Sequence, residues 1–246
     1  MKSVRAGFVT GMIIAALSWP ASVLAQGVEG TRSVYLSVGT GVGLSGNVIE
    51  EGVGTLNDEP GVFVEQAFSN HYSDGLKIRG GFAWGFDYNK EVYGTFGYGK
   101  LNATERVVGS IAGYPLYARF SNARTIDLEG GVRYYFLADG PLRTYVGGVA
   151  GLRFLDEVNT TLRVIELGVT LPDVEYFDTS TLFIFGGDAG IMRDLSPSVA
   201  IGGELGLRFQ PKPGQETFLL ATGFQDINDT GSRWSIPINV FIAYKF

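Results

Sequence analysis

The chain has no cysteine and only one histidine, His71, among its 246 residues. Without cysteine it can form no disulfide bond, no thiolate metal site and no lipid-modified amino-terminal cysteine. A transition-metal site or a catalytic pair of nucleophile and base is also a poor fit, because both draw on residue types that are scarce here. We therefore expect no metal ion, no cofactor and no catalytic residue.

Long apolar runs are scarce too. The mean hydropathy is +0.14, and beyond the amino terminus no stretch is long and apolar enough for a membrane-spanning helix. Residues 1–25 carry Lys2 and Arg5, then an apolar run over 7–17 and a small-residue cleavage site that ends at Ala25. This order predicts a cleaved secretory signal peptide at 1–25. Residues 26–246 then form a single exported domain.

Positive charge is in the minority, with 19 lysines and arginines against 25 aspartates and glutamates. A protein that binds DNA or RNA neutralises backbone phosphates with a basic surface. The acidic balance of this chain therefore argues against a nucleic-acid partner.

The chain does have segments in which apolar and polar residues strictly alternate, and the clearest covers residues 232–246. One phase of this segment is apolar, and it consists of Trp234, Ile236, Ile238, Val240, Ile242, Tyr244 and Phe246. A period of two residues predicts a strand with one apolar face. Aromatic residues at both ends of that face are typical of a lipid-facing strand whose rings lie at two membrane interfaces. A strand of a soluble sandwich is the alternative. Pro237 cannot donate a ladder hydrogen bond, so it predicts a bulge or one missing bond.

Seven earlier segments alternate in the same way, at residues 31–44, 76–86, 91–100, 124–136, 142–154, 181–192 and 199–210. The connections between them alternate between long and short, and the long ones cover 47–74, 101–122, 155–180 and 211–231. Long extracellular loops and short periplasmic turns are typical of outer-membrane barrels. A sheet in hydrocarbon must also close, because unpaired amides there are costly. The pattern predicts an all-β, transmembrane, up-and-down antiparallel β-barrel of eight strands. Ten strands are the alternative, if 62–68 and 114–120 form a further pair.

The aromatic residues of the apolar phase fall into two groups. With the first strand running outward, the periplasmic end carries Trp84, Phe86, Tyr134, Phe136, Tyr244 and Phe246. The outer end carries Tyr98, Phe154, Phe183, Phe209 and Trp234. We expect these rings to form two belts at the membrane–water interfaces.

The polar phase predicts a charged interior. It collects Lys77, Arg79, Asp127, Glu129, Arg133, Arg143, Arg153, Asp188, Glu204, Arg208 and Lys245. An eight-stranded barrel has room for side chains but hardly for a channel. We expect a lumen closed by ion pairs, with the carboxylates in structural rather than catalytic roles. Seven bases against four acids also leave a narrow, weakly anion-selective pore as an alternative.

Function in such a protein would lie in the long loops. The first carries acids that include Glu50, Glu51 and Glu59, and the third includes Asp156 and Glu157. These acids either keep the surface solvated or bind a partner. A divalent cation bridging to lipopolysaccharide phosphates and a surface ligand of unknown identity are the two binding interpretations.

The end of the chain carries a resemblance. Tyr244 and the terminal Phe246, preceded by alternating apolar residues, resemble the carboxyl-terminal signal of bacterial outer-membrane barrels, which the barrel-assembly machinery reads. Together with the signal peptide and the eight strands, this pattern covers nearly the whole chain. It resembles the small outer-membrane β-barrel family of the OmpA-barrel and opacity-protein type.

The resemblance implies a location in the bacterial outer membrane, with its lipids and lipopolysaccharide as partners. It also implies a role as a structural barrel, an adhesin-like surface protein or a small pore. A structural or surface-interaction role is our first expectation, a small-solute pore the second and a lipid-modifying enzyme the third. No peptidoglycan-binding domain follows the barrel, so we expect no tether to the wall.

Overall fold

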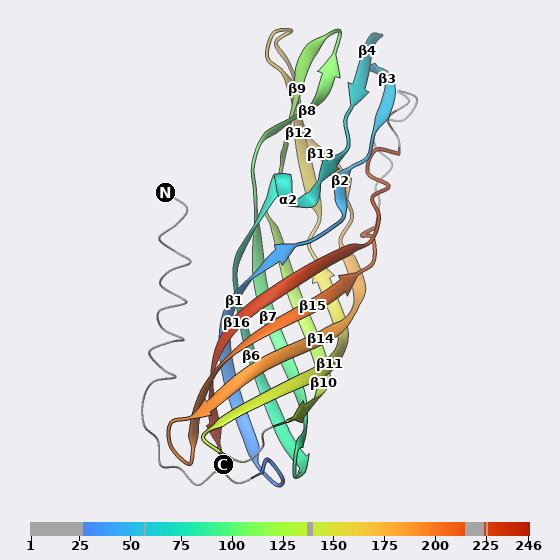
Figure 1. Cartoon of the computed structure of the whole chain (residues 1–246). Coiled ribbons are helices and arrows are strands. Elements are labelled where there is room, and N and C mark those ends of the chain that lie inside the picture. Colours follow the sequence, from blue (N-terminus) through green and yellow to red (C-terminus); the bar gives the residue numbers. More distant parts are fainter. Residues whose placement is uncertain (1–26, 57, 137–139, 215–223, 225) are drawn as a thin grey trace.

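The computed structural model describes residues 27–56, 58–136, 140–214, 224 and 226–246. The predicted signal peptide at 1–25 lies outside the described residues. Two parts follow one another along the long axis of the molecule, a barrel and a smaller β-structure beyond one of its ends (Figure 1). In the described part of the chain no helix is long and apolar enough to cross a membrane.

Eight antiparallel strands form the barrel. They are β1 (Arg32–Gly43), β6 (Tyr72–Asp87), β7 (Lys90–Ala103), β10 (Ala123–Tyr135), β11 (Leu142–Leu155), β14 (Ser180–Asp194), β15 (Val199–Gln210) and β16 (Arg233–Lys245). Their order around the wall is β1-β16-β15-β14-β11-β10-β7-β6, and β6 pairs with β1 to close the sheet. The prediction of an eight-stranded up-and-down barrel is confirmed, and the alternative of ten strands is wrong.

Side chains alternate between the two faces of the barrel wall, as a period of two requires. On β10, Leu128 is 45% exposed on the outer face, whereas its neighbour Glu129 is 5% exposed inside. This polarity is the reverse of that in a soluble protein. An apolar exterior around a closed wall is the arrangement that hydrocarbon stabilises.

Pro237 lies in β16 without a bulge. Its register with β1 is continuous, and Pro237 faces Gly41 there. On the other side, the ladder with β15 keeps the same register but lacks the pairs between Leu205↔Ile238 and Arg208↔Ser235. Of the two accounts predicted for this proline, the structure therefore shows missing ladder contacts.

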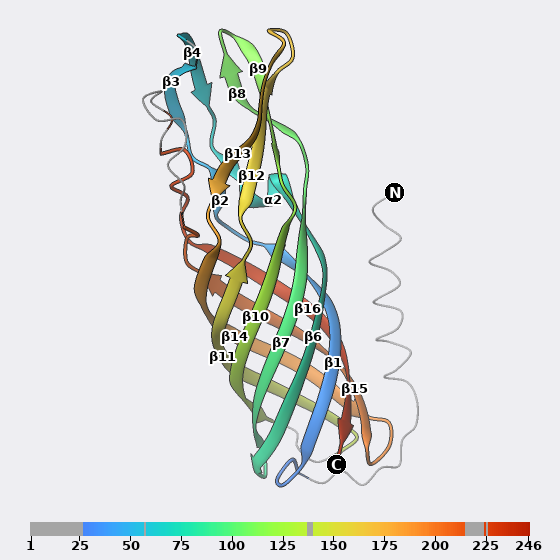
Figure 2. The same cartoon turned by 180° about the vertical axis from the view of Figure 1, so that it is seen from behind.

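The long connections fold into a second β-structure, which we call the cap. Six of its strands form one sheet in the order β13-β12-β9-β8-β4-β3. They are β3 (Gly52–Leu56), β4 (Glu59–Phe63), β8 (Arg106–Ile111), β9 (Tyr114–Phe120), β12 (Val158–Val164) and β13 (Val169–Phe177). The pair β2 (Asn47–Ile49) and β5 (Gln66–Ala67) and the short helix α2 (Phe68–His71) complete the cap. Both views place it beyond the mouth of the barrel (Figures 1 and 2). The segments 62–68 and 114–120 belong to it.

The cap has a hydrophobic core of its own. Phe120 belongs to it, and the centroid of its ring lies 5.2 Å from the ring centroid of His71 and 5.0 Å from that of Tyr176. Buried residues from all four long connections join this cluster, and they include Phe63, Leu162 and Phe224. Because burial of such side chains contributes about 1.5–3 kcal/mol each, the cap is a packed unit rather than a set of separate loops.

Candidate functional site

Charged side chains from several strands meet in the middle of the lumen. Glu204 of β15 accepts hydrogen bonds from Nη2 of Arg79 at 2.6 Å and from Nη2 of Arg133 at 2.9 Å. Glu129 of β10 accepts one from Nη2 of Arg208 at 3.0 Å, and Arg79 Nη1 lies 3.4 Å from it. Arg79 therefore links the two buried carboxylates.

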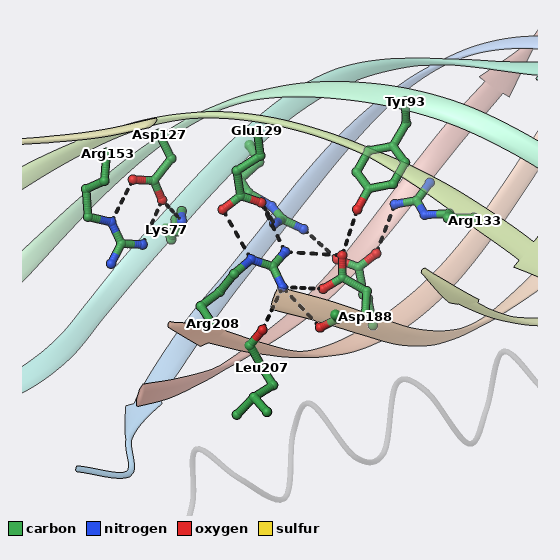
Figure 3. Close-up of polar contacts among 12 residues, drawn as sticks. Lys77, Tyr93, Asp127, Glu129, Arg133, Arg153, Asp188, Leu207 and Arg208 are labelled. Atoms are coloured by element: carbon green, nitrogen blue, oxygen red, sulfur yellow. Dashed lines mark hydrogen bonds and ion pairs between the residues drawn. The ribbon is translucent and has the colours of Figure 1, made fainter. Parts of the chain in front are cut away.

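Arg208 extends this network to the next strand (Figure 3). Its Nη1 donates to Asp188 Oδ1 at 2.7 Å, and further bonds run to the carbonyl oxygens of Gly187 and Leu207. The hydroxyl of Tyr93 donates to the other oxygen of Asp188 at 2.7 Å. The charges of Arg208 and Asp188 are thus hydrogen-bonded as well as paired. Such additional hydrogen bonds offset the free-energy cost of burying an ion pair.

Arg133 lies among aromatic rings. Its guanidinium carbon is 4.0 Å from the ring centroid of Tyr93, 4.8 Å from that of Tyr145 and 5.4 Å from that of Tyr35. Its Nη1 also donates to Glu91 at 3.0 Å. Cation–π contacts add to the ion pairs where water is excluded, so Arg133 is fixed from several sides.

Smaller clusters lie on either side of this network. Toward the cap, Asp127 accepts from Arg153 at 2.8 Å and pairs with Lys77. Toward the short turns, Asp194 pairs with Arg143 and with Lys245, each at 2.5 Å. Ion pairs therefore occur along the length of the lumen.

All eleven residues predicted for the interior lie inside the barrel and take part in at least one ion pair. Sequence reasoning missed two acids, Glu91 and Asp194. It assigned Asp194 to a turn and overlooked Glu91 at the start of a strand, although both follow the polar phase. Adding them raises the acids from four to six. Arg233 also faces the lumen and raises the bases from seven to eight, so the basic excess falls from three to two.

Two cavities lie at opposite ends of the network. One, of about 110 Å³, lies between the ion pairs and the cap, and its lining includes Glu129, Arg153 and Arg208. The other, of about 20 Å³, lies toward the turns and is lined in part by Glu91 and Arg133. The residues of the central network thus separate two small spaces.

The predicted aromatic belts lie on the outer face. At the cap end, the ring of Phe209 is 4.9 Å from that of Phe185 and 5.2 Å from that of Trp234. Tyr98, Phe154 and Phe183 are also exposed there. At the turn end, the exposed rings are those of Trp84, Phe86, Tyr134, Phe136, Tyr244 and Phe246. Phe82 and Phe96 are exposed between the two groups, so the apolar surface is continuous from one end to the other.

The loop residues take unequal places in the cap. His71, the last residue of α2, is fully buried. Burial and the nearby charge of Arg106 lower the pKa of its imidazole to about 4. Glu50, Glu51, Glu59, Asp156 and Glu157 are at least partly exposed. Among the described residues, no three carboxylates or imidazoles lie close enough together to hold a metal ion.

No protein-family model and no curated protein sequence matches the chain. Among solved structures it is similar to Neisserial surface protein A, with 11% identity, a TM-score of 0.49 and coverage of 89% of this chain and 100% of the other. It is also similar to the attachment invasion locus protein Ail of Yersinia pestis, with 11% identity, a TM-score of 0.41 and coverage of 89% and 99%. A third similar structure is OprG of Pseudomonas aeruginosa, with 9% identity, a TM-score of 0.44 and coverage of 90% of this chain and 99% of the other.

The closed wall of eight strands, apolar outside and charged inside, decides the class. The chain has the fold of a small outer-membrane β-barrel. The resemblance predicted from its sequence is therefore confirmed at the level of the fold.

Proposed function

We propose that this protein is an outer-membrane surface protein in which the barrel is a closed anchor and the cap is a recognition surface. Its role is to hold a folded binding surface outside the cell, without catalysis. The observation that carries the proposal is that described residues from all four long connections pack into one hydrophobic core in the cap. A barrel that served only as a membrane anchor would not need such a structure.

The buried charge supports the closed anchor. Arg79, Arg133 and Arg208 each bind carboxylates contributed by other strands, and these contacts cross the lumen. Unpairing a buried charge is strongly unfavourable, so the network resists opening. A small-solute pore is the alternative function. The two additional acids reduce the charge excess on which anion selectivity would rest.

The outer face of the cap supports a binding role. Val53 and Val62 face one another across β3 and β4, and Val53 is 75% exposed. Val64 and Val107 are exposed as well. We call these four residues the valine face. Apolar side chains gathered on a rigid, exposed sheet are typical of protein–protein contact surfaces.

Adherence of whole cells tests the proposed role. Cells of a non-adherent strain that display the protein should bind cultured epithelial monolayers better than cells with an empty vector. Val53→Asp combined with Val62→Asp should reduce that binding by about tenfold, because charge is disfavoured at the centre of an interface. Ile165→Asp, which adds one charge at an exposed apolar residue outside the valine face, is the control.

Surface amounts must be matched by antibody labelling of intact cells. Adherence at the empty-vector level in wild-type cells would contradict the recognition role. Equal adherence of the double variant and wild type would exclude the valine face.

A further inference from the structure

Arg233 is a buried cation at the junction between barrel and cap. It is the first residue of β16, it faces the lumen, and it is 8% exposed. Its guanidinium carbon lies 4.1 Å from the ring centroid of Phe68 in α2 and 5.7 Å from that of Phe177 in β13. Gly46, with φ of +98°, packs against it so closely that a Cβ there would lie 2.5 Å from Arg233 Cγ. The side chain is therefore held in place by its neighbours.

This arginine differs from Arg79, Arg133 and Arg208 in that it has no counter-ion among the described residues. Among the described residues no carboxylate lies within ion-pair distance of it, whereas Arg79, Arg133 and Arg208 each have two such partners. Its Nε and Nη2 are buried, and neither has a hydrogen-bond partner in the described part of the chain. A buried cation without a counter-ion is strongly unfavourable, so an anion bound beside Arg233 would stabilise the fold.

Arg233 lines the cavity of about 110 Å³ beneath the cap. On the barrel side this cavity is bounded by Lys77, Arg153 and Arg208, and the acid among its lining residues is Glu129. Lys77, Arg153 and Arg208 are already engaged in ion pairs. The electrostatic balance of the space therefore favours one additional negative charge, next to Arg233.

The remaining walls are largely apolar. Phe68, Val158 and Phe177 contribute from the cap, and Tyr72 and Leu155 from the ends of the barrel strands β6 and β11. A fully hydrated ion such as sulfate would lose water against such walls without replacing its hydrogen bonds. An anion with an apolar body would place its charge on Arg233 and its carbon chain against the rings.

We propose that this cavity binds a small monocarboxylate with a short apolar body. The carboxylate accepts a charge-assisted hydrogen bond from the guanidinium of Arg233, which lines the cavity. The size is consistent, because a cavity of about 150 Å³ accommodates benzene and this one is somewhat smaller. The proposal does not depend on the surface role of the cap, since it concerns the junction beneath it.

Isothermal titration calorimetry with butyrate as the probe tests this site on the refolded mature protein in detergent. Butyrate should bind, and its neutral counterpart butyramide should bind about tenfold more weakly, because the charge-assisted hydrogen bond is lost. Arg233→Met, which keeps the length of the side chain but removes its charge, should weaken butyrate binding by about tenfold as well. Arg233→Lys should retain part of it. Sulfate should not compete.

A pair of glycine variants provides a test that leaves Arg233 unchanged. Gly43 lines the cavity, and a Cβ there would have only one neighbour, Ser69 Cβ at 4.0 Å. Gly43→Val should fill the space and abolish butyrate binding. Gly80→Val is the matched control, since Gly80 lies on the outer phase of β6 and no atom lies within 4 Å of its Cβ position. The heat-modifiable mobility of each variant on gels reports its folding.

Three results would overturn the proposal. They are no binding of butyrate to the wild type, equal binding of butyrate and butyramide, and unchanged binding in a folded Arg233→Met variant. Effective competition by sulfate would overturn the choice of a carboxylate. If Arg233→Met fails to fold, the comparison of Gly43→Val with Gly80→Val decides the question, and equal binding by these two variants contradicts the site.

Discussion

Arg133 reaches across the lumen to Glu204, with its Nη2 2.9 Å from Oε2 of the carboxylate. The two residues lie on β10 and β15, and β11 and β14 separate these strands in the barrel wall. Contacts between adjacent strands would leave the interior open along its axis. This contact joins opposite walls instead, and Arg79 makes a second one from β6 to the same carboxylate.

The first prediction concerns this network. Glu129→Gln combined with Glu204→Gln should lower the free energy of unfolding by about 3–5 kcal/mol, because buried arginines lose their counter-ions. Arg79 loses both of its partners, whereas Arg143 pairs with Asp194 and should be unaffected. Urea titration of the protein in lipid vesicles measures the change. The exposed pair Glu59→Gln and Glu157→Gln is the control, and an equal effect of both double variants would contradict the role of the network.

The second prediction concerns the outer face. Leu128 lies near the middle of β10, and Val240 lies in the apolar phase of β16. Leu128→Arg and Val240→Arg should each destabilise the inserted barrel by about 2–4 kcal/mol, the usual cost of arginine at the bilayer midplane. Val53→Arg adds the same side chain at an exposed site in the cap and should change stability by at most about 0.5 kcal/mol. Folding yields and urea midpoints in vesicles compare the three. If all three behave alike, Leu128 and Val240 do not face lipid.

The barrel could be predicted from sequence because one physical rule governs it. Each strand separates hydrocarbon from a polar interior, so strict alternation is required along its whole length. The expected segment 199–210 coincides with β15, and the expected segment 142–154 differs from β11 by one residue. Pairing between consecutive strands then gives the order around the wall without further information.

The cap could not be predicted in the same way. Its strands are short, and its sheet joins different connections, since β4 pairs with β8 and β9 pairs with β12. Its core residues, such as Phe63 and Phe120, lie in segments that contain many polar residues. Only the three-dimensional arrangement shows that they pack together. For the same reason, the sequence could not predict that Arg233 lies at the junction of α2 and the mouth of the barrel.

The third prediction concerns assembly. Deletion of Phe246 should leave secretion intact and reduce insertion into the outer membrane, if the assembly machinery reads the terminal residue. Ser232→Ala, a change at the other end of the alternating segment 232–246, serves as the control. Heat-modifiable barrel in outer-membrane fractions is the measure. Normal amounts of the folded barrel after deletion would refute the assembly signal.

The fourth prediction concerns acid. The pKa of His71 is about 4 in the folded cap against a usual value of 6.5, so the unfolded cap binds the proton more readily. The neutral imidazole makes its full contribution to the free energy of unfolding above pH 6.5. This contribution, at most about 3 kcal/mol, is lost as the pH falls toward 4. The protection factors of the cap amides, which correct for the slower intrinsic exchange in acid, should therefore fall as the pH is lowered over this range. His71→Leu should reduce that dependence, and an unchanged pH profile in this variant would contradict the assignment.

The most direct test of the closed anchor is electrical. The refolded wild-type protein in a planar bilayer should show no sustained conductance at physiological salt, because ion pairs cross its lumen at several levels. The variant with Glu129→Gln and Glu204→Gln should open transiently, as unpaired arginines repel one another and admit water. Steady, anion-selective channels from the unmodified protein would contradict the closed lumen and favour a pore.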